Sequence, residues 1–365
     1  MAKHIVIAVT NDLVTDQRVA RIADTLMDSG YKITLVGRMF PAQFPLSREY
    51  SVKRFHLLFN KGALFYANYS IRLFFYLLFK KFDAVLSNDL DTLPGSFIAA
   101  WLRRKVILYD SHEYFTEVPE LVNRNFQKQT WIGIERFILP NIKFAYTVCE
   151  SIANEYKLKY STDFKVVRNL PTRKPALQTT SENVLIYQGA LNLGRGIELM
   201  IETMQYLDDY TLWIAGAGDV EDDLKALTVK LNLSDKVKFL GRIPLNELHA
   251  LTSKAKLGLS FEEDMGLNYR FALPNKLFDY IQAQIPVLVS DLPEMKRVVN
   301  EYRVGEVLKF RESQKVAEQI LEMLNNKEEW LKMKRHLEKA ASELCWENEK
   351  RKLITIFEKA IPISC

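Results

Sequence analysis

Short apolar segments rich in valine and isoleucine alternate with longer amphipathic segments along almost the whole chain of 365 residues. This alternation is typical of βα units, in which a buried parallel strand is followed by a helix that covers the sheet. The pattern stops at residues 165–181, where two prolines and several serines and threonines indicate a linker. The sequence therefore predicts two α/β domains, each with a doubly wound, Rossmann-like sheet.

The expected strands form one series before the linker and one after it. The predicted domains are residues 1–172 and 173–344, and a last helix at about 345–365 is expected to return to the first domain. A helix from Asp16 to Ser29, capped by Gly30, should follow the first strand, and residues 311–360 should be almost wholly helical. Strands are expected at residues 5–9, 33–36, 52–56, 84–87, 106–109 and 146–149, and then at 184–188, 211–215, 237–240, 257–261, 287–290 and 304–308.

The composition is that of a folded soluble protein, with 48% hydrophobic and 26% charged residues. Fifty basic and 45 acidic residues leave a formal charge of +5, which is too slight an excess to indicate a nucleic acid partner. Cys149, Cys345 and Cys365 lack the spacing of metal ligands or of a disulfide framework, which favours a reducing compartment. The N-terminus resembles a first strand and lacks the features of a signal peptide. We therefore expect a cytoplasmic protein.

Residues 61–82 form the most aromatic part of the chain and carry Lys61, Arg72, Lys80 and Lys81. Their apolar run is too short to span a bilayer. One interpretation is a core helix with a basic end. The other is a helix that lies on anionic lipid at the inner face of the membrane.

The segment from Glu262 to Asp291 predicts a ligand site. A loop leads through Pro274 into a short helix that starts near Asn275, and an apolar strand follows. Free N–H groups and the positive end of the helix dipole favour an anion there, and Lys276 adds charge. Asp279, one turn further on, can accept hydrogen bonds from a vicinal diol such as ribose. Phosphate and sugar binding together indicate a nucleotide or a nucleotide sugar.

Three further loops follow predicted strands of the second domain. In the first, Gly189 permits a close backbone approach to phosphate, and Arg195 can bind two of its oxygens. The second contains a Gly-x-Gly turn that ends at Gly218, a weak signal alone. In the third, backbone groups near Arg242 and Ile243 could pair with a base edge.

Polar residues also follow strands of the first domain. His112 and Glu113 lie in the segment DSHE and are candidates for contact with a reacting centre, whereas Asp91 lies in the segment DLDTLP. Asp16 and Arg18 follow the first strand, where helix capping is the simpler interpretation. These three segments would meet a substrate at the same edge of the sheet.

Taken in order, these segments resemble the retaining glycosyltransferases of family four, which have the GT-B fold: two Rossmann-like domains that face each other across a cleft. FEEDMGL resembles the family's Glu-x7-Glu signature, with Glu263 as the first carboxylate, Gly266 as the loop glycine and Asp279 as the second carboxylate. The resemblance assigns Arg195 to the donor diphosphate and His112 to the donor sugar. The final segment, CWENEKRKLITIFEKA, also resembles the family's last helix.

The resemblance implies transfer of a sugar from a nucleotide donor, expected to be a UDP- or GDP-sugar, to a glycan or lipid-linked acceptor in envelope or exopolysaccharide synthesis. Retention of configuration, no cofactor and no metal are expected, although Asp89 and Asp91 form an Asp-x-Asp pair by count. The chain departs from the family where extra residues, LNYRFALPNK, follow Gly266 and where Ala190 follows Gly189. The alternatives are a sugar-nucleotide epimerase of the same fold and a non-catalytic GT-B scaffold that binds glycan. A dinucleotide oxidoreductase is disfavoured because Gly-x-Gly-x-x-Gly is missing after either first strand.

Overall fold

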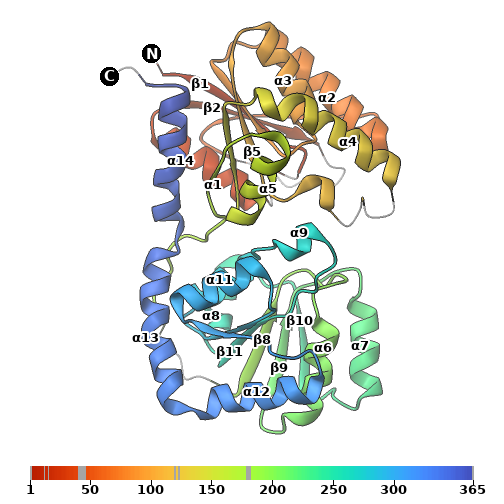
Figure 1. Ribbon diagram of the computed structural model, residues 1–365, viewed down its shortest axis with the longest axis vertical. Helices are drawn as coiled ribbons and strands as arrows, with labels where there is room; N and C mark the ends of the chain where they lie inside the picture. The colour runs from red at the N-terminus through yellow and green to blue at the C-terminus, as the bar shows by residue number, and fades with distance from the viewer. Residues whose placement is uncertain are drawn as a thin grey trace. The chain divides into compact units, whose positions relative to one another are not determined.

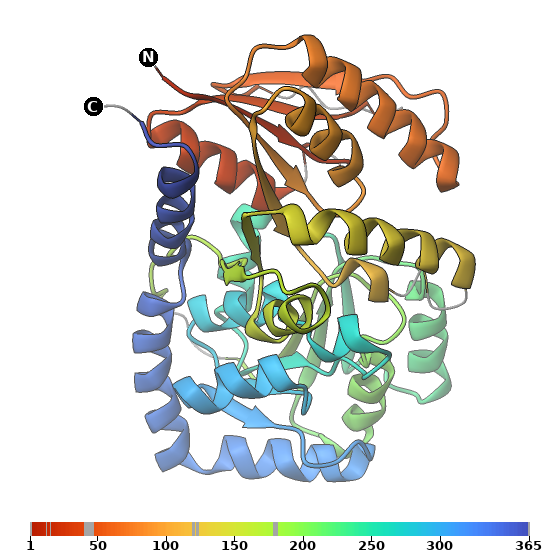
Figure 2. The ribbon, with the colours of Figure 1, turned by 45° about the horizontal axis from the view of Figure 1, so that its top comes forward.

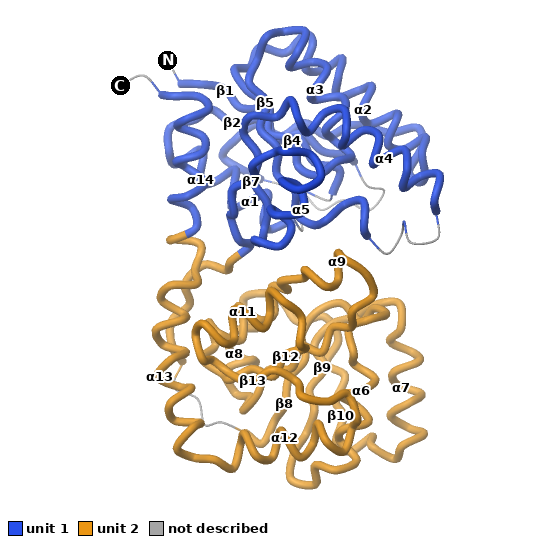
Figure 3. Tube along the Cα trace, viewed as in Figure 1, with its two compact units in different colours: residues 1–169, 349–365 blue, residues 170–348 orange. Residues whose placement is uncertain are grey.

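The computed structural model describes residues 2–11, 13–14, 16–39, 47–118, 121, 124–177 and 182–363. The chain divides into two compact units (Figure 3). Unit 1 comprises residues 1–169 and 349–365, and unit 2 comprises residues 170–348. The predicted boundaries, 172/173 and 344/345, lie within four residues of these divisions.

Unit 1 contains a parallel sheet in the order β3-β2-β1-β4-β5-β6-β7. Figure 1 labels β1, β2 and β5 of this sheet. Its central strands are buried on both faces, as expected for continuous apolar runs under helices. The strands are β1 (His4–Ala8), β2 (Lys32–Arg38), β3 (Ser51–Phe55), β4 (Ala84–Asn88), β5 (Val106–Ser111), β6 (Phe144–Thr147) and β7 (Phe164–Val166). The helices are α1 (Gln17–Asp28), α2 (Gly62–Phe79), α3 (Leu93–Leu102), α4 (Asn125–Ile138), α5 (Glu150–Tyr160) and the 3₁₀ turns η1 (Phe115–Glu117) and η3 (Leu139–Asn141).

Unit 2 contains a second parallel sheet in the order β10-β9-β8-β11-β12-β13. Its two apolar cores, one on each face of the sheet, are built from strand and helix side chains. The strands are β8 (Val184–Gln188), β9 (Thr211–Ala215), β10 (Val237–Gly241), β11 (Leu257–Ser260), β12 (Val287–Val289) and β13 (Gly305–Val307). The helices are α6 (Ile197–Thr203), α7 (Glu221–Lys230), α8 (Leu245–Thr252), α9 (Leu267–Arg270), α10 (Asn275–Gln282), α11 (Pro293–Tyr302), α12 (Ser313–Asn325), α13 (Lys327–Glu343) and the turn η4 (Met204–Tyr206).

The last helix, α14 (Trp346–Ala360), begins in unit 2, and from Glu349 onward it belongs to unit 1. Its contacts with unit 1 are specific: the Phe357 ring packs edge-on against Tyr31 at 6.3 Å, and the Tyr31 hydroxyl donates to the Ile361 carbonyl at 3.0 Å. The C-terminal segment therefore completes the first unit, although more than 170 residues of unit 2 separate it from the rest of that unit.

The strand order reverses direction between β1 and β4 in unit 1 and between β8 and β11 in unit 2. Loops that leave the carboxyl ends of two such strands diverge, and the gap between them is the usual ligand position in open α/β sheets. The order confirms the predicted pair of doubly wound sheets. It also directs attention to the loops after β1, β4, β8 and β11.

Candidate functional site

A buried ion pair lies at the switch point of unit 2. Glu262 follows β11, and Lys276 lies in the first turn of α10. The Lys276 Nζ atom is 2.7 Å from Glu262 Oε1, and both side chains are buried. The ammonium also lies over the Tyr187 ring, 4.1 Å from its centroid. The predicted cation at the start of α10 is therefore present, held between a carboxylate and an aromatic face.

The pKa values of Glu262 and Lys276 depend on burial and on the charge that each side chain presents to the other. Burial alone would raise the pKa of Glu262, but Lys276 and the Ser260 hydroxyl, which donates to Oε2 at 2.7 Å, hold that pKa below its usual value. Burial lowers the pKa of Lys276, and the carboxylate opposes that effect. The Glu262 carboxylate is thus ionised and keeps a compensating cation beside it.

Arg195 and Gly189, from the loop after β8, meet the same pair. The Arg195 guanidinium is 3.8 Å from Glu262 Oε1 and lies over the Tyr269 ring at 5.5 Å. Gly189 has a backbone φ of +135°, and a Cβ atom there would lie 3.4 Å from the Lys276 Cε atom. Two cations predicted separately from the sequence are therefore gathered around one carboxylate, beside backbone that only glycine adopts readily.

The structure distinguishes two adjacent glutamates. Glu263, the residue predicted to act at the donor sugar, has a side chain that is about half exposed and lies 3.7 Å from Arg311. Its backbone N–H donates to the Gly194 carbonyl at 2.9 Å. Glu262 is the carboxylate that contacts Lys276. Sequence reasoning missed it, although its place directly after the buried Phe261 was a signal that it stays nearer the sheet.

Asp279 and Asn275 lie on α10, as predicted. The Asp279 carboxylate accepts a hydrogen bond from Gln188 Nε2 at 3.0 Å, and Gln188 Oε1 accepts one from the Thr252 hydroxyl at 2.8 Å. Asp279 is partly buried, whereas Asn275 is exposed at the first position of the helix. Gln188, the last residue of β8, thus holds the Asp279 side chain in place.

The remaining predicted donor residues lie farther along the same edge of the sheet. Gly218 allows the loop after β9 to pack on the loop after β8, because a Cβ atom there would lie 2.3 Å from the Leu191 carbonyl oxygen. Arg242, exposed, and Ile243, partly buried, follow β10 at the edge of the sheet. Gly266 precedes α9 with φ +125°, and a Cβ atom there would have no other described residue within 4 Å apart from its chain neighbours. None of these four contacts Lys276 through an interaction found among the described residues.

The switch-point region of unit 1 contains His112 between two carboxylates. The Nδ1 atom of His112 is 3.2 Å from Asp89, and the Nε2 atom is 3.0 Å from Asp110. The His112 backbone N–H also donates to Asp89 Oδ1 at 2.8 Å. Asp89 itself has a left-handed backbone, with φ 57°, which is uncommon for a residue other than glycine. Both ring nitrogens are therefore engaged by acceptors.

Arg18 lies beneath this histidine. Its guanidinium donates to both carboxylate oxygens of Asp110, at 2.8 and 3.1 Å, and to the Val167 carbonyl at 3.1 Å. Arg18 and Asp110 are both buried. Arg18, which was predicted on the acceptor side, has a buried partner, Asp110, that also binds His112. Asp16 accepts from the Val19 N–H and caps α1, which agrees with the simpler interpretation of that segment.

Asp91 and Glu113 complete the predicted residues of unit 1. Asp91 is buried and accepts a hydrogen bond from the Thr10 hydroxyl, while its Oδ1 atom has no hydrogen-bond partner in the described part of the chain. Burial raises the pKa of Asp91 to about 6. Glu113 has an exposed side chain, and its carbonyl accepts from the Ser111 hydroxyl at 2.8 Å.

The His112 cluster predicts a measurable titration. Burial opposes protonation, but Asp89 and Asp110 raise the pKa of His112 to about 9. Because this pKa lies above the usual 6.5, the protonated His112 stabilises the folded state fully below pH 6.5. That contribution to folding stability is lost as the pH rises through 9. We expect an NMR titration of His112 to have its midpoint near 9, and Asp89→Asn to lower it by at least about one unit. His249, whose pKa burial lowers, serves as internal reference. An unchanged His112 midpoint in Asp89→Asn would contradict the assigned pairing.

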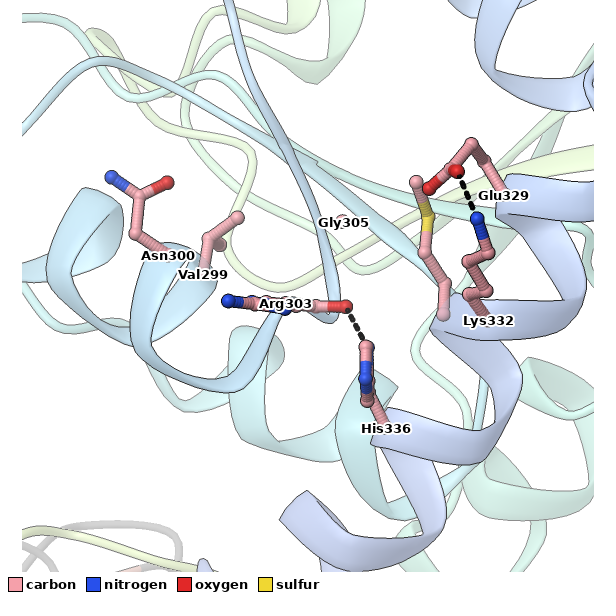
Figure 4. A pocket seen from close by; sticks show the side chains of 8 residues that line it. Val299, Asn300, Arg303, Gly305, Glu329, Lys332 and His336 are labelled. Atoms are coloured by element: carbon pink, nitrogen blue, oxygen red, sulfur yellow. Dashed lines mark hydrogen bonds and ion pairs between the residues drawn. The ribbon is translucent and has the colours of Figure 1, made fainter.

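A cavity lies elsewhere in unit 2, between α11 and α13, with a volume of about 600 Å³ (Figure 4). Its polar groups pair with one another: His336 contacts the Arg303 carbonyl, and Lys332 contacts Glu329. It contains none of the predicted donor residues. Across the described ranges, no group of three or more histidine, cysteine, aspartate or glutamate residues is placed to hold a metal ion.

Comparison with known proteins finds a family model and a relative that match parts of the chain. Residues 171–343 match the family model described as Glycosyl transferases group 1. The O-antigen chain mannosyltransferase RfbU of Salmonella typhimurium is 32% identical over 158 residues, which are 42% of this chain. The match spans 43% of the length of that curated relative.

Solved structures resemble the chain over its full length. The glycosyltransferase from Rickettsia africae ESF-5 superposes with a TM-score of 0.75 at 12% identity and covers 100% of both chains. Anabaena Alr3699/HepE in complex with UDP gives a TM-score of 0.75 at 12% identity, over 98% of this chain and 100% of that one. At these identities the likeness establishes the fold. The chain thus has the GT-B fold, and its residues 171–343 match the family model described as Glycosyl transferases group 1.

Proposed function

We propose that the chain is a glycosyltransferase whose nucleotide-sugar donor binds to unit 2. The observation that carries this proposal is the gathering of Lys276, Arg195 and Gly189 at the switch point of a glycosyl transferases group 1 domain. Two cations and the N-terminus of α10 suit a diphosphate. Asp279 on the same helix is assigned to the ribose, and the backbone near Ile243 to the base.

The proposed chemistry is departure of the nucleoside diphosphate from the anomeric carbon. Negative charge grows on the diphosphate as the bond breaks, and preorganised cations stabilise that charge more strongly in the transition state than in the ground state. Glu262 is assigned the role of holding Lys276 and Arg195 in position before the donor arrives. A buried carboxylate with a hydroxyl donor on its other oxygen is well suited to that role.

Unit 1 is assigned to the acceptor and to the donor sugar. The His112 imidazolium lies between Asp89 and Asp110, so a substrate hydroxyl would have to replace one carboxylate to reach a ring nitrogen. Asp91, with a buried oxygen that lacks a donor among the described residues, is the proposed acceptor of a hydroxyl hydrogen bond. Glu263 and Gly266 remain proposals for the sugar end of the donor.

The finer parts of the proposal concern substrates and stereochemistry. The donor is proposed to be a UDP- or GDP-sugar, which the UDP complex of Anabaena HepE supports, and the acceptor a glycan or lipid-linked glycan, which the name of the Salmonella relative supports. Transfer is proposed to retain the anomeric configuration and to need neither cofactor nor metal. The cytoplasm is the proposed location, in keeping with the free thiols of Cys149 and Cys345.

The experiment is a thermal-shift screen of the chain against UDP, GDP, ADP and their sugars, followed by an assay of nucleotide release. We expect one nucleoside diphosphate to raise the unfolding midpoint, and its sugar to release nucleotide only when a glycan or lipid-linked acceptor is supplied. NMR of the product would give its anomeric configuration, and EDTA should leave the rate unchanged. Conversion of the donor to an isomer without nucleotide release would instead indicate an epimerase.

A further inference from the structure

Helix α2 is apolar on two sides, and only one of them is covered. Phe65, Tyr69, Leu73 and Leu77 are buried in the core of unit 1. A helix that is apolar all round normally lies inside a protein or a bilayer, because both sides need cover. The residues offset from the buried stripe, Ile71, Phe75 and Phe79, are instead exposed. The core interpretation of residues 61–82 therefore accounts for only one side of this helix.

Helix α3 extends the exposed side. Figures 1 and 2 show α2 and α3 side by side in unit 1, and their close contact is made where Gly95 approaches the Ser70 carbonyl. The outward residues of α3 are Ile98, Trp101 and Leu102. The α2/α3 face, defined as Ile71, Phe75, Phe79, Ile98, Trp101 and Leu102, includes a phenylalanine that is 81% exposed and a tryptophan that is 71% exposed. Contiguous exposed apolar groups of this size mark an interaction surface.

Basic residues edge this face at the C-terminal ends of both helices. Lys80 and Lys81 follow α2, and Arg103, Arg104 and Lys105 follow α3. Arg103 donates to the Leu77 carbonyl at 2.8 Å and to the Lys80 carbonyl, which ties the two helix ends together. The sequence has no Asp or Glu at residues 62–82 or 92–105. The adjacent Asp83 pairs with Lys105 at 3.9 Å. Lys80, Lys81 and Arg104 still leave an excess of positive charge beside the apolar face.

We propose that the α2/α3 face docks on the surface of an anionic phospholipid bilayer. Aromatic and aliphatic side chains would enter the boundary between headgroups and acyl chains, while Lys80, Lys81 and Arg104 meet anionic headgroups. A second copy of the chain fits this face less well, because a two-fold axis through it would bring the same cations together. No helix among the described ranges is long and apolar enough to cross a membrane. The proposal is independent of glycosyl transfer.

The test is sedimentation of the full chain with two kinds of vesicle. One kind contains phosphatidylcholine alone, and the other contains phosphatidylcholine with about 30 mol per cent of phosphatidylglycerol. We expect binding to the anionic vesicles, weakened at least about tenfold by Phe79→Ser with Trp101→Ser. Lys80→Glu with Lys81→Glu should weaken it by at least about 30-fold, because two attractive charges are lost and two repulsive ones are introduced. The matched control, Val229→Ser with Leu331→Ser, removes two exposed apolar residues of unit 2 and should bind like the parent.

Thermal unfolding and nucleotide affinity of each variant show whether it is folded, and these should not change, since every substituted side chain is solvent-exposed. Equal vesicle binding by the parent and the Phe79/Trp101 variant would overturn the proposal. The proposal would also be overturned if the parent did not bind vesicles but formed a dimer, and the Phe79/Trp101 variant were monomeric. The α2/α3 face would then be an interface between two copies of the chain. Because nucleotide binding is measured separately, failure of membrane docking is distinguishable from failure of the proposed donor site.

Discussion

Replacing Lys276 with alanine is expected to lower donor affinity by about 100-fold or more, because the substitution removes a charge-assisted contact to the diphosphate. It should also lower the free energy of unfolding by about 3 kcal/mol, since Glu262 would remain buried with only Arg195, at 3.8 Å, as a cationic partner. Calorimetric titration with the nucleotide found by screening gives the affinity, and thermal unfolding gives the stability.

A double variant separates these two effects. Lys276→Met with Glu262→Gln removes both charges, so most of the lost stability should return while donor binding stays lost. Lys296→Met is the matched control, because Lys296 is a half-exposed lysine of unit 2 that pairs with Asp291 at the surface. If the double variant binds the donor like the parent, Lys276 has only a structural role and the proposed diphosphate site is wrong.

Replacing His112 with glutamine is expected to reduce the rate of sugar transfer by about 100-fold or more, with donor affinity within about threefold of the parent. Donor affinity should be retained because His112 belongs to unit 1, whereas the cations assigned to the diphosphate belong to unit 2. Single-turnover transfer from a labelled donor gives the rate, and calorimetry gives the affinity.

Two controls interpret that result. His56→Gln changes an exposed histidine of unit 1 and should transfer sugar at the parental rate. Asp89→Asn lowers the pKa of His112 without removing the ring, so a rate loss that follows the changed pH profile would point to the imidazolium itself. Normal transfer by His112→Gln would show that the Asp110–His112–Asp89 cluster only supports the fold.

The strands could be predicted wherever an apolar run has clear ends. Residues 184–188 and 211–215 coincide with β8 and β9, because each is a run of β-formers bounded by polar or glycine residues. The short strand β7, Phe164–Val166, was missed. It has three residues, one of them Lys165, and it merges into the linker, so its only strong determinant is pairing with β6. Local sequence cannot reveal a pairing of that kind.

In the candidate site, too, some residues could be predicted from local sequence and others could not. Lys276 and Arg195 could be predicted, because each lies in a loop or first helical turn directly after a strand, where the fold itself places ligands. Glu262 was not chosen over Glu263 because periodicity fails at the end of a strand, and its position directly after the buried Phe261 was the one local signal in its favour. Arg18 could not be paired with Asp110, a partner 92 residues away. Such contacts depend on how the sheet is assembled.

Hydrogen–deuterium exchange, with and without the nucleoside diphosphate found by screening, tests the central claim most directly. The predicted result is protection of backbone amides at residues 189–196 and 262–279, which comprise the loops after β8 and β11 and the start of α10, where the diphosphate is proposed to bind. Protection confined to the α11/α13 cavity around Arg303 and His336, or to unit 1, would contradict the assignment of the donor to the switch point of unit 2.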